Sequence, residues 1–143
     1  MRIPRKTLTS FVFAFPLCVS SLASAEIAVI VNPSAGVDSA GKEEIARLFL
    51  NKATNIKGVS LTPIDQVEDS KARNAFYQKV GDKTPAQLNA YWSRLIFTGK
   101  GQPPEAVADD AEVVQSVGEN PGNIGYVDAS AVNASVKVIF TAP

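Results

Sequence analysis

The chain has 143 residues, with 14 basic and 14 acidic side chains, one cysteine and no histidine. Without histidine, Ser-His-Asp and Cys-His catalytic sites cannot form, and no Asp-rich loop has the spacing of a calcium site. We therefore expect a binding protein with no catalytic residues, no bound metal and no cofactor.

Residues 1–25 have the layout of a secretory signal peptide. A positively charged start precedes the apolar stretch Phe11–Val19 and the small residues Ala23-Ser24-Ala25, which fit an A-x-A cleavage site. The positive charges are Arg2, Arg5 and Lys6. The apolar stretch is shorter than the roughly 20 residues that a membrane-spanning helix needs. We therefore expect cleavage after residue 25, loss of Cys18 with the signal, and a periplasmic or secreted protein.

The remainder, residues 26–143, is expected to form one domain. It carries 11 basic and 14 acidic side chains, since three cations lie in the signal, and this acidic balance argues against nucleic-acid binding. No cysteine remains to form a disulfide, so the domain relies on its core, for which this length suffices. No further apolar run of membrane-spanning length follows, so we expect no membrane span after cleavage.

The first predicted elements are a strand and a helix. Glu26–Val31 is a largely apolar, β-branched run, typical of a strand covered on both faces in an α/β sheet. The turn signal Asn32-Pro33-Ser34 ends it. Asp38 or Ser39 is then expected to cap a helix that runs to about Asn51.

A second strand and a second helix are predicted next. Val59–Ile64 is predicted to be a strand in which Pro63 favours an edge or a bulge, and residues 65–69 are predicted to be a polar loop. Asp69 or Ser70 is expected to cap a helix that Gly81 ends. The inward side chains of this helix are expected to be Ala72, Ala75, Phe76 and Val80.

Two further helices complete the helical part of the pattern. Thr84-Pro85-Ala86-Gln87 predicts a capping box, at the start of a helix that runs to about Phe97. Its side chains at 88, 91, 92 and 95 share one face, which favours core packing for Tyr91 and Trp92 over a ligand-stacking role. After a Gly- and Pro-rich loop, Asp109 or Asp110 is expected to cap a fourth helix.

The chain then contains two more strand candidates, Ile124–Val127 and Val136–Phe140. The order of elements predicts an α/β domain with a small, at least partly parallel sheet.

Two strand-to-helix junctions are candidate anion sites, because a helix N-terminus directs unpaired backbone N–H groups and a positive dipole end at its loop. The first junction, residues 32–39, contains Ser34. The second, residues 65–73, adds Ser70, Lys71 and Arg73, a hydroxyl and two cations. The alternative is that Ser70 only caps the helix and that both cations are solvated surface charges. Lys71 gains nothing from the helix dipole there, which favours a functional role.

Four segments resemble periplasmic phosphate-binding proteins, the solute receptors of phosphate ABC transporters. Residues 46–52, ARLFLNK, resemble the IFLGK helix end of these receptors, and residues 121–127, PGNIGYV, resemble their PGAIGYV segment. Residues 63–76 resemble their loop-plus-helix anion element. Residues 91–104 are similar to the short, single-lobe members of the superfamily.

The resemblance implies a single periplasmic-binding-protein type II-like lobe, a small mixed sheet flanked by helices. It implies phosphate or a similar small oxyanion as the ligand, for ABC-type transport or sensing. Full-length receptors close two lobes around phosphate, whereas this chain has the length of one lobe. A twofold homodimer is therefore expected to supply the second wall of the cleft.

The resemblance also implies which residues hold the ligand. Ser70 carries over directly, and Asp65 matches by position. Gln66-Val67 stand near the place of the family's arginine, and Lys71-Ala72 replace the Gly-Thr that follows its serine. Arg73 is the candidate substitute for the missing cation.

A second hypothesis belongs to another class of function. The lobe would then have no ligand and would act as an interaction module of the periplasm, with a membrane sensor or an ABC permease or other transporter component as its partner.

Overall fold

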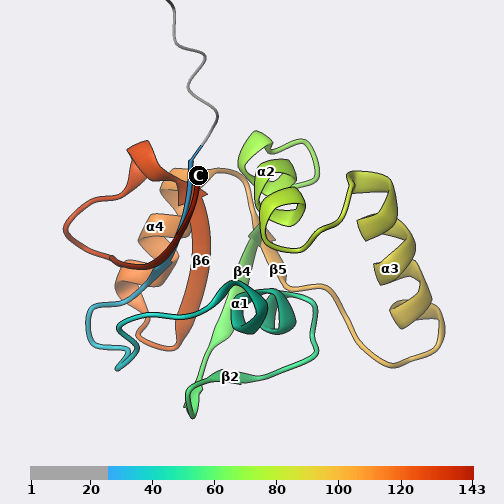
Figure 1. Ribbon diagram of the computed structural model, residues 1–143, viewed down its shortest axis with the longest axis horizontal. Helices are drawn as coiled ribbons and strands as arrows, with labels where there is room; N and C mark the ends of the chain where they lie inside the picture. The colour runs from blue at the N-terminus through green and yellow to red at the C-terminus, as the bar shows by residue number, and fades with distance from the viewer. Residues whose placement is uncertain (1–25) are drawn as a thin grey trace, which may run out of the picture.

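A computed structural model describes residues 26–143 and shows a five-stranded mixed sheet with helices on both faces (Figure 1). The expected signal peptide and its cleavage site lie outside the described residues. The sheet contains β1 (Ile27–Val31), β4 (Thr62–Gln66), β5 (Glu105–Val107), β6 (Asn123–Asp128) and β7 (Lys137–Ala142). The helices are α1 (Lys42–Phe49), α2 (Lys71–Lys79), α3 (Pro85–Phe97), α4 (Asp110–Glu119) and the 3-10 turn η1 (Ala129–Ala131). A separate hairpin is formed by β2 (Asn55–Ile56) and β3 (Val59–Ser60).

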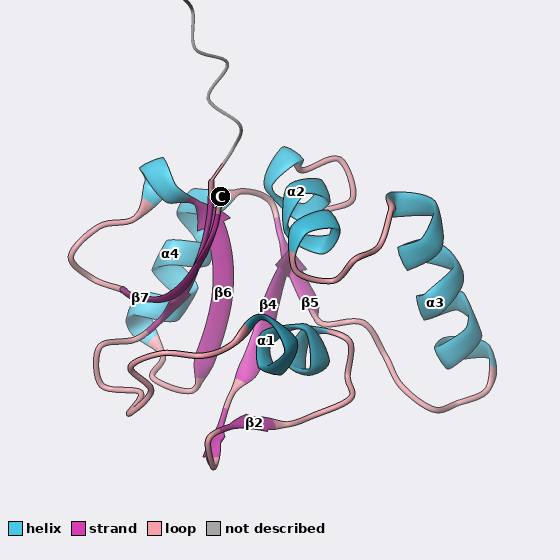
Figure 2. Cartoon of the chain, in the orientation of Figure 1, coloured by secondary structure: helices cyan, strands magenta, loops and turns pink. Residues whose placement is uncertain are grey.

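The strand order is β5-β4-β6-β1-β7. Figure 2 shows β4, β5, β6 and β7 of this sheet. β4 is parallel to both β5 and β6, whereas β1 is antiparallel to both β6 and β7. The carboxyl ends of β4, β5 and β6 therefore lie at one edge of the sheet, and the carboxyl end of β1 lies at the opposite edge. This arrangement confirms the predicted α/β fold with a small mixed sheet.

β1 is covered on both faces, as its apolar sequence predicted. Its alternate residues Ile27, Val29 and Val31 belong to the hydrophobic cluster on the side of α1 and α2, while Ala28 and Ile30 belong to the cluster with α4. All five are buried. The two hydrophobic clusters thus lie on either side of the sheet, which is why β1 lacks the polar alternation of a half-exposed strand.

α4 approaches the sheet closely at Gly125 of β6. A Cβ atom at Gly125 would lie 2.4 Å from Cγ1 of Val113 and 3.3 Å from Cγ2 of Val117. Any larger residue would therefore push α4 away from the sheet, so the glycine determines the helix-to-sheet distance.

Three predicted elements were wrong. The predicted strand Val59–Ile64 is divided, because Val59–Ser60 pairs with β2 as β3 and β4 begins only at Thr62. α1 begins at Lys42 with Gly41 as its N-cap, because the chain before it is held extended by a bond from the Ala40 N–H to the carbonyl of Ile139. β4 continues to Gln66 through the start of the predicted loop, and it pairs there with β5, a strand that the sequence did not predict. Pro63 precedes the stretch of β4 that pairs with β5, so its missing N–H costs no ladder bond there.

α3 lies at one end of the long axis of the molecule, set apart from the sheet (Figure 1). The capping box between Thr84 and Gln87 is present as predicted. Leu88 and Trp92 are buried, which confirms the core role expected for Trp92, and Tyr91 is partly buried. Within residues 26–143, no helix has the length and apolar character needed to cross a membrane.

Candidate functional site

A hollow opens where the carboxyl ends of β4 and β5 meet the N-termini of α2 and α4. We call it the α2–α4 hollow; its volume is about 240 Å³. Its lining residues are Gln66, Ser70, Lys71, Ala72, Ala108, Asp109 and Asp110. Ligand sites of open α/β sheets occur at this edge, outside the carboxyl ends of parallel strands.

Ser70 is the N-cap of α2, as predicted, and its Oγ accepts the N–H of Arg73 at 3.2 Å. The amides of Lys71 and Ala72 precede the capped amide, and the first amides of a helix have no partner within that helix. Both residues line the hollow. The positive end of the α2 dipole and the Lys71 ammonium therefore lie at the same opening.

Gln66 connects the two helix starts. Its Nε2 donates to Oδ1 of Asp110 at 2.8 Å and to the carbonyl of Tyr126 at 3.0 Å, and its Oε1 accepts the Ser70 hydroxyl at 2.6 Å. The side-chain amide is thereby bonded at both ends. Near the place where the resemblance puts an arginine, this chain has a neutral group that ties α2 to α4.

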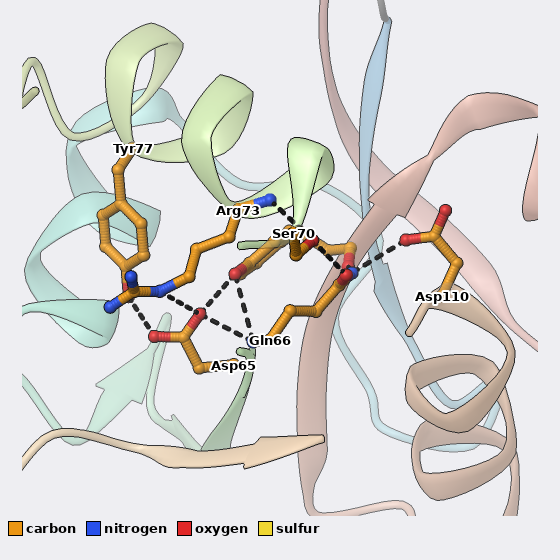
Figure 3. A network of polar contacts seen from close by, with 7 residues as sticks. Asp65, Gln66, Ser70, Arg73, Tyr77 and Asp110 are labelled. Carbon is orange, nitrogen blue, oxygen red and sulfur yellow. Dashed lines mark hydrogen bonds and ion pairs between the residues drawn. The ribbon is translucent and has the colours of Figure 1, made fainter. Parts of the chain in front are cut away.

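Behind the hollow, Asp65 is the centre of a buried polar cluster (Figure 3). Its Oδ1 accepts the Gln66 N–H at 2.8 Å and the hydroxyl of Tyr126, and its Oδ2 accepts the hydroxyl of Tyr77 at 2.6 Å. Nε of Arg73 lies 3.7 Å from Oδ1. Asp65 is only 2% exposed, so these partners replace water around the carboxylate.

The environment of this cluster perturbs its tyrosines. Burial, followed by the charge of Asp65, raises the pKa of Tyr77 well above its ordinary value. The same two causes raise the pKa of Tyr126. Both phenols therefore stay protonated and act as hydrogen-bond donors to Asp65 throughout the physiological pH range.

The structure brings together only part of the predicted site. Ser70 and Lys71 line the hollow. Arg73 is buried and its guanidinium extends away from the hollow, toward Asp65 and over the Tyr77 ring at 5.5 Å (Figure 3). Asp65 and Arg73 are therefore an internal ion pair, and the alternative of a solvated surface charge was wrong for Arg73.

Ser34 lies away from these residues. It follows β1, whose carboxyl end is at the opposite edge of the sheet from the ends of β4 and β5. Its N–H is bonded to Oδ1 of Asn32 at 2.9 Å, and α1 begins only at Lys42. The first junction thus does not place Ser34 at a helix N-terminus.

Sequence reasoning missed two contributors to this region, Asp110 and Tyr126. Asp109 caps α4 by accepting the Glu112 N–H at 3.0 Å, which leaves Asp110 free to bond Gln66. The sequence did contain a signal for this, because only one of the adjacent residues Asp109 and Asp110 can be the N-cap and the other is available for a different contact. Tyr126 was assigned to a strand correctly, but the partner of its hydroxyl depends on the parallel pairing of β4 and β6.

The hollow therefore combines opposite charges. Lys71 and the two helix N-termini attract an anion, whereas Asp109 and Asp110 repel one. An oxyanion that carries its own proton can donate it to a carboxylate and accept from the amides. A fully deprotonated anion can accept hydrogen bonds from the amides but has no proton to donate to a carboxylate.

Comparison with known proteins shows what this fold is similar to. No protein-family model and no curated protein matches the chain. Among solved structures, an ABC-type phosphate transport receptor from Vibrio cholerae superposes with a TM-score of 0.61 at 19% identity, over 80% of this chain and 46% of the receptor. A putative phosphate ABC transporter substrate-binding protein from Clostridium perfringens, solved with bound phosphate, gives 0.59 at 23% identity, over 80% and 45%. PstS from Borrelia burgdorferi gives 0.57 at 16% identity, over 80% and 47%.

The chain thus has the fold of one lobe of a periplasmic binding protein. More specifically, the structures from Vibrio cholerae and Clostridium perfringens are described as a phosphate transport receptor and a putative phosphate ABC transporter substrate-binding protein, and the chain spans about half of their length. This similarity confirms the fold that the resemblance implied.

Proposed function

We propose that this chain is an exported solute-binding lobe that binds phosphate or a similar protonated oxyanion in the α2–α4 hollow. The observation that carries the proposal is the opening itself, where the first amides of α2, its cap Ser70 and the Lys71 ammonium line one hollow. The bound phosphate named for the Clostridium perfringens structure supports the choice of ligand. The role is binding rather than catalysis, for ABC-type transport or sensing.

The two acids at the hollow determine its expected selectivity. Phosphate carries an ionisable proton near neutral pH and can donate it to Asp109 or Asp110, whereas sulfate carries none. Binding to one lobe is expected to be weak, since only one wall encloses the ligand. A second copy of the chain would supply the other wall in a twofold dimer.

Calorimetric titration of residues 26–143 with phosphate and with sulfate tests this proposal. We expect heat with phosphate at millimolar concentration, less with sulfate, and loss of the phosphate signal in Lys71→Glu. Lys100→Glu is the matched control, because Lys100 is exposed, forms no ion pair within residues 26–143 and does not line the hollow. Absence of both heat and a thermal shift with millimolar phosphate would show that the proposal is wrong.

A second candidate function is the ligand-free interaction module, with a membrane sensor or transporter component as partner. The exposure of Phe97, which is 93% accessible, favours it. If the Phe97→Ser variant no longer captures such a component while the Lys71→Glu variant still does, the interaction module is supported. If Lys71→Glu loses capture and Phe97→Ser retains it, the solute-binding lobe is supported.

A further inference from the structure

The two longest stretches of the domain without an acidic residue are residues 45–64 and residues 83–104. Each contains three cations; they are Arg47, Lys52 and Lys57 in the first and Lys83, Arg94 and Lys100 in the second. The rest of residues 26–143 carries five basic side chains and all 14 acidic ones. The positive and negative side chains are therefore distributed unevenly over the domain, which its small net charge does not show.

The two acid-free segments meet in the fold. The Tyr91 hydroxyl of α3 donates to the carbonyl of Leu50 at 2.5 Å. The ammonium groups of Lys52 and Lys83, one from each segment, lie 5.8 and 5.2 Å from the centroid of the Tyr91 ring. At the far end of α3, Gly101 approaches Asn51 so closely that a Cβ would lie 2.4 Å from its Nδ2.

None of these six cations takes part in an ion pair with a carboxylate of residues 26–143. Asp82, which directly precedes the second segment, is paired with Lys42 at 3.1 Å. We call these six cations together the basic face; Arg47, Lys52 and Lys57 line one hollow, and Arg47, Lys52 and Lys83 line another. Glu43, Glu44 and Asp82 lie in the same hollows without pairing with these cations, so the basic face keeps a net positive charge and favours an anionic partner.

The basic face ends in an exposed aromatic side chain. Phe97 is 93% exposed at the last residue of α3, and Ile96 beside it is 48% exposed. Tyr91, Arg94 and Phe97 are spaced three apart and so are neighbours on the helix surface. The turn after them is fixed by bonds from the amides of residues 98, 99 and 100 to carbonyls of α3, so the backbone holds Phe97 where its side chain projects into solvent.

We propose that the basic face, with Phe97 at its tip, docks the domain onto an anionic phospholipid surface. The cations would lie among the lipid phosphates, and Phe97 would insert at the boundary between headgroups and acyl chains. A second copy of the chain is a poorer occupant, because a twofold contact through this face would oppose two sets of unpaired cations.

A bilayer also fits this surface better than an acidic protein does. Four of the six cations line two hollows, whereas Arg94, Lys100 and the exposed apolar side chain of Phe97 lie outside them. A diffuse negative surface that deforms around a projecting ring satisfies both features, whereas a protein partner needs a matching pocket and fixed acidic positions.

Vesicle sedimentation with residues 26–143, which contain the whole described core, tests the proposal. We expect binding to vesicles of phosphatidylglycerol and phosphatidylcholine, no binding to phosphatidylcholine alone, and release at about 0.5 M salt. The double variant Arg94→Glu and Lys100→Glu is expected to bind at least about tenfold more weakly, and Phe97→Ser about fivefold.

Two matched controls lie on β7, away from the basic face. Lys137→Glu reverses one charge, which is paired with Asp38 in the parent, and Val138→Ser removes an apolar side chain that is 37% exposed; both are expected to bind as the parent does. Far-ultraviolet circular dichroism checks that each variant is folded. No binding to the phosphatidylglycerol vesicles at low salt, or equal losses in the β7 controls, would overturn the proposal.

Discussion

The buried tyrosines predict that the domain loses stability at alkaline pH. Tyr77 and Tyr126 both donate to Asp65, and burial together with that carboxylate raises the pKa of each above its ordinary value. In the unfolded chain both phenols ionise near pH 10, while in the folded protein they stay protonated. The folded state therefore binds more protons above pH 10, so its stability is complete below that pH and falls above it.

The size of this loss follows from the two tyrosines. In the unfolded chain each phenol ionises near pH 10, whereas in the folded protein it stays protonated. At pH 11 each such phenol therefore lowers the free energy of unfolding by about 1.4 kcal/mol. Two such groups lower the free energy of unfolding by about 2.8 kcal/mol. Tyr77→Phe removes one of them, so the loss between pH 9 and pH 11 is expected to be about 1.4 kcal/mol smaller in the variant than in the parent.

Urea unfolding followed by Trp92 fluorescence, at a series of pH values from 8 to 11, measures this dependence. The comparison of slopes cancels the contribution of other groups, which the parent and the variant share. Tyr77→Phe also loses its bond to Asp65 and starts from a lower stability, but this offset does not depend on pH in that range. An equal loss in the parent and in Tyr77→Phe would refute the assignment.

Two other substitutions test the packing and the helix starts. Gly125→Ala is expected to destabilise the domain by about 1–3 kcal/mol, because its Cβ would overlap Val113 of α4, and thermal unfolding measures the change. Thr84→Ala removes the side-chain half of the α3 capping box and is expected to cost about 1 kcal/mol in urea unfolding. A neutral result for either one would mean that the corresponding contact does not form in solution.

Features that depend on local sequence were predictable. The apolar run of β1 identified a strand buried on both faces, and the caps Ser70, Thr84 and Asp109 identified three helix starts. In each case the signal lies within a few residues of the element, and the same side chain that appears in the pattern makes the structural bond.

Features that depend on distant partners were not predictable. β5 has no apolar pattern of its own, with two exposed residues among three, and is ordered by its parallel pairing with β4. Asp38 and Ser39 have the chemistry of caps, but the bond between Ala40 and Ile139 of β7 delays the helix.

The candidate site shows the same division. Ser70 and Lys71 were placed at a helix start correctly, because the strand-to-helix junction is local. Arg73 was expected to face the ligand, yet it shares the inward face of α2 with Phe76 and Tyr77 and is paired with Asp65. The inward face predicted for this helix included Phe76 but neither Arg73 nor Tyr77. The buried carboxylate that accommodates the charge of Arg73 belongs to β4, which was assigned to a loop at that point.

An NMR titration of ¹⁵N-labelled residues 26–143 with phosphate tests the central claim most directly, because it reports on each amide separately. We predict that the largest shifts occur at the amides of Lys71 and Ala72, with smaller ones at the start of α4. Unchanged amides at the α2–α4 hollow, or shifts confined to the basic face around Lys52 and Lys100, would contradict an oxyanion site at the start of α2.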